Sequence, residues 1–366
     1  MILTTRGITV KYFIRIIGLL LCVAMSIGVL AACEEKPVAN YSENYETRVD
    51  FGAKFEPKGN YILHGAGQDE NGVTVTFDRY AEVMGDELMP AVTMGYTAPH
   101  HNYVDWTMYM KQGMEAYGDE QYLFLQVGVH FNKDENPDEA YYDDIADGKM
   151  DMEIKSLVQI LKSFKRPVFC RPGFEFNGQW NGYTDPEIYK RAFIRFAEIV
   201  EECGADNIAL LWCYNPGGAA KDYMAYYPGN EYVDWWAIDI FDASSLTQTD
   251  TVSFLADAQQ HKKPIMVTEA TPKGYDITQG EGWEEWYEPF FRFVRENPVV
   301  KGTCYINWEW TTYPQWSNWG DSRIEAAAAE LREKYIQEMS DNIYFHATDK
   351  KSAIKALYDC RDYDKS

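Results

Sequence analysis

The sequence predicts an α/β protein folded as a (β/α)8 TIM barrel. Eight short β-rich runs recur along the chain, their starts lie 26 to 45 residues apart, and helical segments fill most of the gaps. A strand with its crossover helix takes roughly 30 residues, and regular alternation of the two indicates a parallel sheet. Eight such units favour a closed barrel over an open doubly wound sheet.

The eight strands are expected where apolar, β-branched and aromatic residues cluster. The runs begin, in order, at Tyr61, Glu87, Gln121, Arg166, Asn207, Val233, Lys263 and Val300. An open nucleotide-binding sheet would place a GxGxxG loop after its first strand. This chain has HGAGQDENG there, from His64 to Gly72, and its glycine spacing does not fit that motif.

Helices are expected between these runs, and the clearest covers Asp185 to Cys203. Asp185 is a candidate N-cap, Pro186 suits the first turn and Gly204 is a candidate stop. Further helices are expected at Met152–Lys165, Thr251–His261, Trp283–Glu296 and Ile324–Met339.

The composition is that of a globular protein with an unusual number of flat rings. Of 366 residues, 46% are hydrophobic and 15% aromatic, with 11 Trp and 27 Tyr. The formal charge of −23 disfavours nucleic acid as a partner, because binding the phosphate backbone needs a basic face. The net charge does not exclude neutral ligands.

The first 32 residues resemble a secretory signal peptide. Three basic residues precede an apolar run, and Leu30-Ala31-Ala32-Cys33 resembles a bacterial lipobox. Cleavage would leave Cys33 as a lipidated first residue, so the chain is expected to be exported and anchored to a bacterial membrane. The alternative is a single membrane-spanning anchor, for which the run is short. Residues 33–59 are expected to be a tether and lead-in, and 60–366 the catalytic domain.

The remaining cysteines do not form a disulfide framework. Cys170, Cys213 and Cys304 lie in apolar runs and are expected to be buried free thiols, as Cys residues often are. No metal-ligand spacing occurs, so neither a metal nor a cofactor is expected. The acidic stretch Asp134–Asp144 lacks EF-hand spacing and is expected to be a solvated loop.

Two glutamates are the strongest catalytic candidates, because active sites of this barrel lie where strands end. Glu175 closes RPVFCRPGFE, and Glu269 closes KPIMVTE. Retaining glycosidases use two carboxylic groups about 5 Å apart. One of them is a general acid whose pKa burial raises, and the other attacks the sugar. For a single strand-end Glu, a surface ion pair is the more common role.

The segment RPGFEFNGQW, from Arg171 to Trp180, resembles the acid/base strand of glycoside hydrolase family 26. That family contains β-mannanases and related endo-glycanases. The segment from Tyr226 to Phe241 resembles the family's stretch leading through strand six, and the similarity extends from about Asn60 to Met339. The resemblance implies an endo-acting retaining hydrolase of a β-linked polysaccharide. β-Mannan is the leading substrate, with β-1,3-xylan or mixed-linkage glucan behind it.

The resemblance also implies roles for individual residues. Glu175 would be the acid/base and Glu269 the nucleophile. The family usually has His where this chain has Phe174 and Tyr where it has Phe241, so both positions lack a hydrogen-bonding group. These departures leave the two glutamates in place but weaken the inference about substrate.

Five residues are candidates for binding the substrate: Arg171, Trp180, Asn215, Trp308 and His101. Each has an ordinary structural alternative. Arg171 could hold the nucleophile ionised or form an ion pair inside the barrel, Asn215 could cap a loop, and His101 could be a solvated turn residue. Trp180 and Trp308 could stack on sugar or pack in the core. Three further tryptophans are weaker candidates for subsites: Trp212, Trp310 and Trp316.

Two other functions compete with hydrolysis. A catalytically weak barrel that binds glycans at the cell surface would fit the changes at Phe174 and Phe241. A barrel enzyme of another class, such as an aldolase, would be expected to carry a Lys or a metal cluster at its strand ends. Neither is evident, so the sequence favours the hydrolase.

Overall fold

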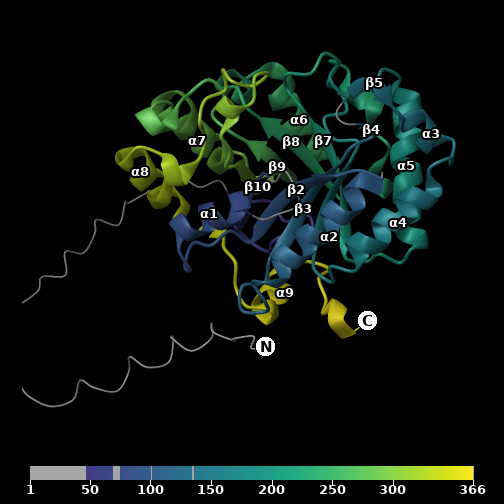
Figure 1. Ribbon diagram of the computed structural model, residues 1–366, viewed down its shortest axis with the longest axis horizontal. Coiled ribbons are helices and arrows are strands. Elements are labelled where there is room, and N and C mark those ends of the chain that lie inside the picture. Colours follow the sequence, from purple (N-terminus) through teal and green to yellow (C-terminus); the bar gives the residue numbers. More distant parts are fainter. Residues whose placement is uncertain (1–46, 69–74, 100, 134–135, 366) are drawn as a thin grey trace, which may run out of the picture. The chain divides into compact units, whose positions relative to one another are not determined.

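The computed structural model describes residues 47–68, 75–99, 101–133 and 136–365 (Figure 1). Eight parallel strands close into a barrel, as predicted, because β1 pairs with both β2 and β10. The barrel strands in order are β1 (Ile62–Gly67), β2 (Val92–Thr97), β3 (Phe124–Val129), β6 (Val168–Pro172), β7 (Ile208–Tyr214), β8 (Trp235–Ile240), β9 (Ile265–Ala270) and β10 (Val300–Ile306). Each lies within or directly beside its predicted run.

Helices follow most of the barrel strands, as the crossovers of a parallel sheet require, but only the short 3-10 turns Tyr223–Tyr226 and Asn230–Tyr232 lie between β7 and β8. The α-helices are α1 (Val75–Met84), α2 (His101–Glu115), α3 (Tyr142–Ala146), α4 (Asp151–Lys162), α5 (Pro186–Glu202), α6 (Thr249–Gln260), α7 (Glu288–Glu296), α8 (Ala329–Met339) and α9 (Lys350–Ala356). The predicted start of α5 is confirmed. The Asp185 carboxylate accepts from the backbone N–H groups of Glu187 and Ile188.

Two predicted helices differ in detail. The segment 324–339 is not one helix, because the chain becomes extended at Ala327 and Ala328 before α8 begins. There the Ala328 N–H donates to the Ile277 carbonyl, a tertiary contact that the sequence pattern does not reveal. The segment 283–296 starts with a wide turn over Trp283–Tyr287 and becomes regular only in α7.

The barrel strands are buried on both faces. Residues such as Leu63, Met94 and Phe169 fill the barrel interior. Their strand neighbours pack outward against the helices, where Trp212 and Phe196 are among the fully buried side chains. Alternation along each strand therefore decides which side chains reach the site at the carboxyl ends.

Residues 47–59 of the expected lead-in are part of the folded unit. Phe55 is fully buried, and the Trp235 indole N–H donates to the Lys54 carbonyl at 2.7 Å. Lys301, at the start of β10, donates to Asp50 at 2.6 Å. Residues from 47 onward therefore close the amino-terminal end of the barrel, although the sequence analysis places them before the domain.

The acidic stretch expected to be a solvated loop is exposed at Asp138, Glu139 and Asp143, but its described residues are not a loop. Its described residues form the antiparallel hairpin of β4 (Asn132–Lys133) and β5 (Asn136–Ala140), followed by α3. The hairpin lies against the turn after β6, since the Asn132 amide donates to Asn181.

The cysteine prediction is confirmed, because Cys170, Cys213 and Cys304 are free and buried. Across the described ranges, no helix is both long and apolar enough to cross a membrane. Residues 1–32 and Cys33 lie outside the described residues, so the signal and the lipid anchor stay predictions.

Candidate active site

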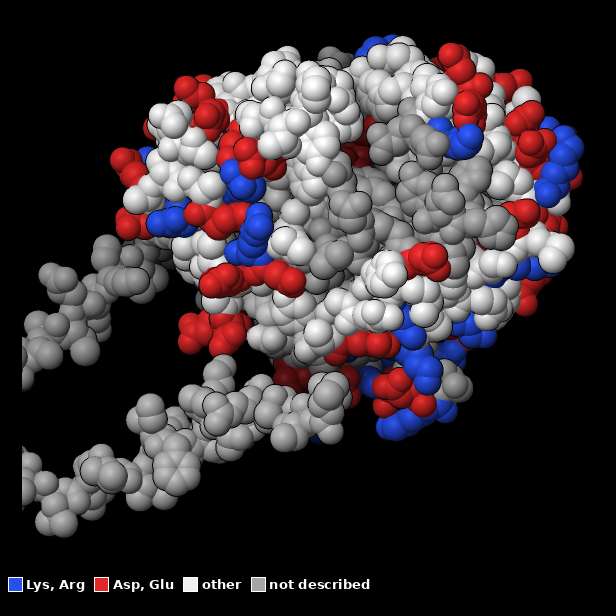
Figure 2. All heavy atoms as spheres, viewed as in Figure 1, with Lys and Arg blue, Asp and Glu red and all other residues white. Residues whose placement is uncertain are grey.

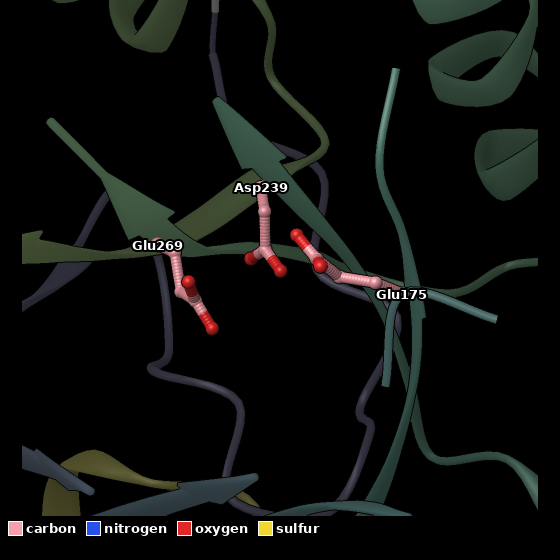
Figure 3. Close-up of side chains that lie close together, drawn as sticks. All are labelled: Glu175, Asp239 and Glu269. Carbon is pink, nitrogen blue, oxygen red and sulfur yellow. The ribbon is translucent and has the colours of Figure 1, made fainter. Parts of the chain in front are cut away.

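Three carboxylates converge at the carboxyl end of the barrel (Figure 3). Glu269 lies near the end of β9 and Asp239 pairs with it in register on β8. Glu175 comes from the turn after β6, where its φ of 48° is in the left-handed region that non-glycine residues rarely adopt. One oxygen of each carboxylate lies within 4.8 Å of one from each of the others. The sequence therefore predicted correctly that the two glutamates meet.

Asp239 is the residue that the sequence analysis did not select. In Figure 3 it lies between the two glutamates, and it is only 1% exposed. The alternation of residues along β8 could have identified it, because Trp235, Ala237 and Asp239 all point into the barrel interior. A charged residue at an interior strand position needs a partner.

Arg171 is that partner, and it contacts both neighbouring carboxylates. This fully buried guanidinium donates from Nη2 to Glu269 Oε1 at 2.8 Å and from Nη1 to Asp239 Oδ2 at 3.1 Å. The Gln126 amide oxygen, turned toward the guanidinium, accepts from Arg171 Nε and Nη2. The two roles proposed for Arg171 are therefore combined, because one side chain forms the interior ion pair and contacts the expected nucleophile.

The Asp239 carboxylate is held from several sides. Thr268 donates to its Oδ1 at 2.6 Å and the Cys213 thiol donates to its Oδ2 at 3.2 Å. Burial, and then the charge of Glu269, raise the pKa of Asp239 to about 7, although Arg171 opposes this shift. Burial disfavours the charged form of Arg171, but the two carboxylates outweigh it and raise the pKa of Arg171 well above its usual value.

Glu175 is held in a different environment from Glu269. The Trp180 indole N–H donates to its Oε2 at 2.5 Å, and the Asn215 amide donates to its Oε1. Burial raises the pKa of Glu175 well above its ordinary value, and the nearby charges of Asp239 and Glu269 add to the rise. A carboxyl group that keeps its proton is suited to general acid catalysis.

The two donors to Glu175 are themselves positioned by neighbouring residues. Two hydrogen bonds join Asn177 to Asn215. The Asn177 side-chain amide donates to the Asn215 backbone carbonyl at 2.7 Å, and Asn177 Oδ1 accepts from the Asn215 backbone N–H at 3.0 Å. At Gly178 a Cβ atom would lie 2.4 Å from the Trp180 ring, so the absence of a side chain lets the indole cover this backbone. Trp180 and Asn215 thus contact the expected acid, whether or not they also contact substrate.

Phe174, which stands where the family usually has His, packs within the site. Its ring lies 4.7 Å from the Arg171 guanidinium carbon and 4.8 Å from the centre of the His130 ring. Burial, followed by the charge of Arg171, lowers the pKa of His130 to about 3. The cation in this part of the site is therefore Arg171, covered by an aromatic face.

Aromatic residues of the segment after β10 form a rim beside Phe241. Trp308 is partly exposed and stacks on Tyr313 with ring centres 5.7 Å apart. Phe241 packs against Trp319 at 5.1 Å. Partly exposed indoles are suited to stacking on sugar faces. Among the described residues on the face seen in Figure 2, acidic and basic side chains lie mostly toward the margin.

Two of the weaker tryptophan candidates are corrected by the structure. Trp212 points outward from β7 and is fully buried against Phe176, and Trp310 is only 5% exposed. Trp316 is partly exposed. His101 is not a turn residue but the first residue of α2, and its side chain lies outside the described part of the chain.

The three carboxylates also have the chemistry of a ligand set for a hard cation. However, Arg171 already places a positive charge against Asp239 and Glu269. Arg171 therefore supplies a positive charge to two of the three carboxylates.

Arg171→Leu should lower the free energy of unfolding by about 3–5 kcal/mol, because Asp239 and Glu269 would be left buried without their cation. Denaturant unfolding measures this loss. Arg195→Leu is the control, since it breaks partly exposed ion pairs with Asp151, Glu198 and Glu202, each of which should contribute about 1 kcal/mol or less. Equal losses in the two variants would contradict the account of the buried cluster.

Comparisons with known proteins place the chain among glycoside hydrolase sequences. Residues 132–282 match the sequence model of glycosyl hydrolase family 26. A β-1,3-xylanase from a Vibrio species is 29% identical over 255 residues, which are 62% of this chain and 53% of that protein. A β-1,3-xylanase from an Alcaligenes species is 30% identical over 231 residues, which are 55% and 47%. The chain spans about half the length of these curated relatives.

Solved structures support the fold. The catalytic domain of an endo-β-1,4-mannanase of family 26 from Bacillus sp. JAMB-750 superposes with a TM-score of 0.58 at 17% identity, covering 82% of this chain and 91% of that one. At this identity the likeness concerns the barrel alone. Support for the family that the strand motifs predict comes from the sequence matches.

Proposed function

We propose that this chain is a retaining, endo-acting glycoside hydrolase of family 26 that cleaves a β-linked polysaccharide. The observation that carries the proposal is the proximity of Glu175 and Glu269, whose carboxylate oxygens approach within 4.8 Å. Carboxyl groups about 5 Å apart suit double displacement, whereas inverting enzymes need about 6.5–9.5 Å for a water molecule.

The surroundings of the two glutamates divide their roles. Glu175, whose pKa is raised by burial and by neighbouring charge, would protonate the leaving glycosidic oxygen. Glu269 receives a hydrogen bond from Arg171, which holds in place the carboxyl group that would attack the anomeric carbon. Glu175, now ionised, would then take a proton from water as that water displaces Glu269 from the sugar.

The substrate is proposed at two levels. A β-linked polysaccharide is supported by the family match and by the relatives' names. The sequence motifs favour β-mannan, while the names of two relatives favour β-1,3-xylan. The ring of Phe174 covers Arg171 without offering a hydrogen bond to a sugar hydroxyl, so the site differs from the motif's usual form.

Export and anchoring complete the proposal. Residues 1–32 would be removed, and lipid on Cys33 would hold the barrel at the cell surface or at the periplasmic face of a membrane. A polysaccharide that cannot enter the cell would meet the enzyme there. Radiolabelled palmitate should enter the wild-type chain but not Cys33→Ala.

The test of the reaction uses soluble protein that starts after Cys33, with Glu269→Ala as its control. Both are incubated with mannan, galactomannan, β-1,3-xylan, mixed-linkage glucan and xylan, and new reducing ends are measured. Release by the wild type alone supports the proposal and identifies the substrate. Binding to one glycan without release would instead support a surface glycan-binding function and would point to Phe174 and Phe241.

A further inference from the structure

Tyr96 occupies a place in the site that no motif indicated. It lies near the end of β2, where Val92, Met94 and Tyr96 alternate onto the barrel interior. Its ring packs against Phe174 and His130, with ring centres 5.7 and 6.0 Å away. On β3, a Cβ at Gly128 would lie 2.9 Å from the Tyr96 ring, so the missing side chain makes room for it.

The Tyr96 side chain lies between Gln68 and the charged cluster. Its hydroxyl donates to Gln68 Oε1 at 2.9 Å, and its ring lies 5.8 Å from the guanidinium carbon of Arg171, which donates to Glu269. Burial, and then the charge of Glu269, raise the pKa of Tyr96 well above its usual value, so the phenol keeps its proton as a donor. Gln68 has a φ of 134°, a strained conformation for a residue with a side chain.

Phe241 makes this position informative. It follows β8, two residues beyond Asp239 and on the same face of that strand, but its ring packs on Trp319 and carries no hydroxyl. The hydroxyl expected from strand six is therefore absent. A phenol from β2, which is separated from β9 by β10 and β1 in the closed barrel, lies near the charge of Glu269 instead.

We propose that Tyr96 is a further catalytic residue, whose hydroxyl hydrogen-bonds with Glu269 and assists release of the glycosyl-enzyme intermediate. The inference rests on the proposed function. In the second step, Glu175 takes a proton from water, the water oxygen bonds to the anomeric carbon, and the bond from that carbon to Glu269 breaks. The electron pair returns to the Glu269 carboxylate, where the Tyr96 hydroxyl stabilises the developing negative charge.

Tyr96→Phe tests this role with dinitrophenyl β-xylobioside and dinitrophenyl β-mannobioside. The dinitrophenolate group leaves easily, so formation of the intermediate is fast and its breakdown limits turnover. Loss of a hydrogen bond to a charged group should lower kcat about 10- to 100-fold. The value of kcat/KM, which reports formation of the intermediate, should fall less, and a burst of dinitrophenol should appear.

Two variants serve as controls. Tyr214→Phe removes a buried hydroxyl at the end of β7 that has no hydrogen-bond partner, and it should behave as wild type. Gln68→Leu removes the acceptor to which Tyr96 donates, and it should keep kcat within a few-fold. If Gln68→Leu reproduces Tyr96→Phe, or if kcat and kcat/KM fall equally in Tyr96→Phe, the proposed role is overturned.

A structure of the trapped intermediate gives a test that does not depend on how a variant folds. A 2-deoxy-2-fluoro glycoside of the cleaved sugar should leave Glu269 covalently bound in the wild type. The Tyr96 hydroxyl should then lie within hydrogen-bond distance of the Glu269 carboxyl group. A hydroxyl turned wholly to Gln68 would overturn the inference while leaving the proposed function intact. Wild type that releases no dinitrophenol from either substrate and cleaves no glycan would instead defeat the proposed function itself.

Discussion

Glu269→Ala should lower turnover at least about 10⁴-fold on every glycan that the wild type cleaves, because removing a catalytic nucleophile abolishes the covalent route. The position of Glu269 makes the expectation specific. Its carboxylate is 6% exposed, faces Glu175 across the site and accepts from Arg171. Reducing-end release under saturating substrate measures the loss.

A loss of activity must be separated from a loss of structure. Glu269→Ala leaves Arg171 paired with Asp239, so the fold should persist, and circular dichroism with thermal unfolding checks this. Azide is small enough to enter the space that the alanine leaves. With a dinitrophenyl glycoside it should restore turnover and give a glycosyl azide of inverted configuration. Activity near that of the wild type without azide would remove Glu269 from the mechanism.

The fold was predictable because it depends on local pattern repeated many times. Each barrel strand is a short apolar run bounded by polar residues, and helix α5 has both its cap at Asp185 and a single apolar stripe. A local error at one element does not change such a prediction. The extended residues before α8 were not predictable in this way. They are held by a tertiary hydrogen bond to the Ile277 carbonyl, and no local sequence pattern indicates that contact.

The site was predictable only in part, for a related reason. Glu175 and Glu269 end strands, and the fold alone brings strand ends together. Asp239 could have been found from its interior position on an apolar strand, since a buried charge requires a cation such as Arg171. Tyr96 could not, because its place near Glu269 depends on space left by Gly128, which lies on a different strand.

Glu175→Gln should separate substrates by their leaving groups. On a polysaccharide, whose leaving alcohol needs a proton, turnover should fall about 10²- to 10⁴-fold, the usual worth of general acid catalysis. On a dinitrophenyl glycoside the first step needs no proton and should be nearly unchanged. Gln keeps the size of Glu175, but its single amide oxygen can accept from only one of the two donors, Trp180 or Asn215. Thermal unfolding of the variant therefore has to accompany the activity measurement, and the difference between the two substrates reports the chemistry.

The pH dependence gives the same prediction a second readout. The pKa of Glu175 is raised by its burial and by the charges of Asp239 and Glu269, so its acid form persists above the ordinary range of a carboxyl group. Polysaccharide cleavage by the wild type should therefore be retained below that raised pKa and lost as the pH rises through it. Glu175→Gln cannot lose a proton, so its kcat/KM on the dinitrophenyl glycoside should lack this basic limb. If Glu175→Gln loses equal activity on both substrates, and its pH profile still falls at high pH, then Glu175 is not the acid and another group supplies the proton.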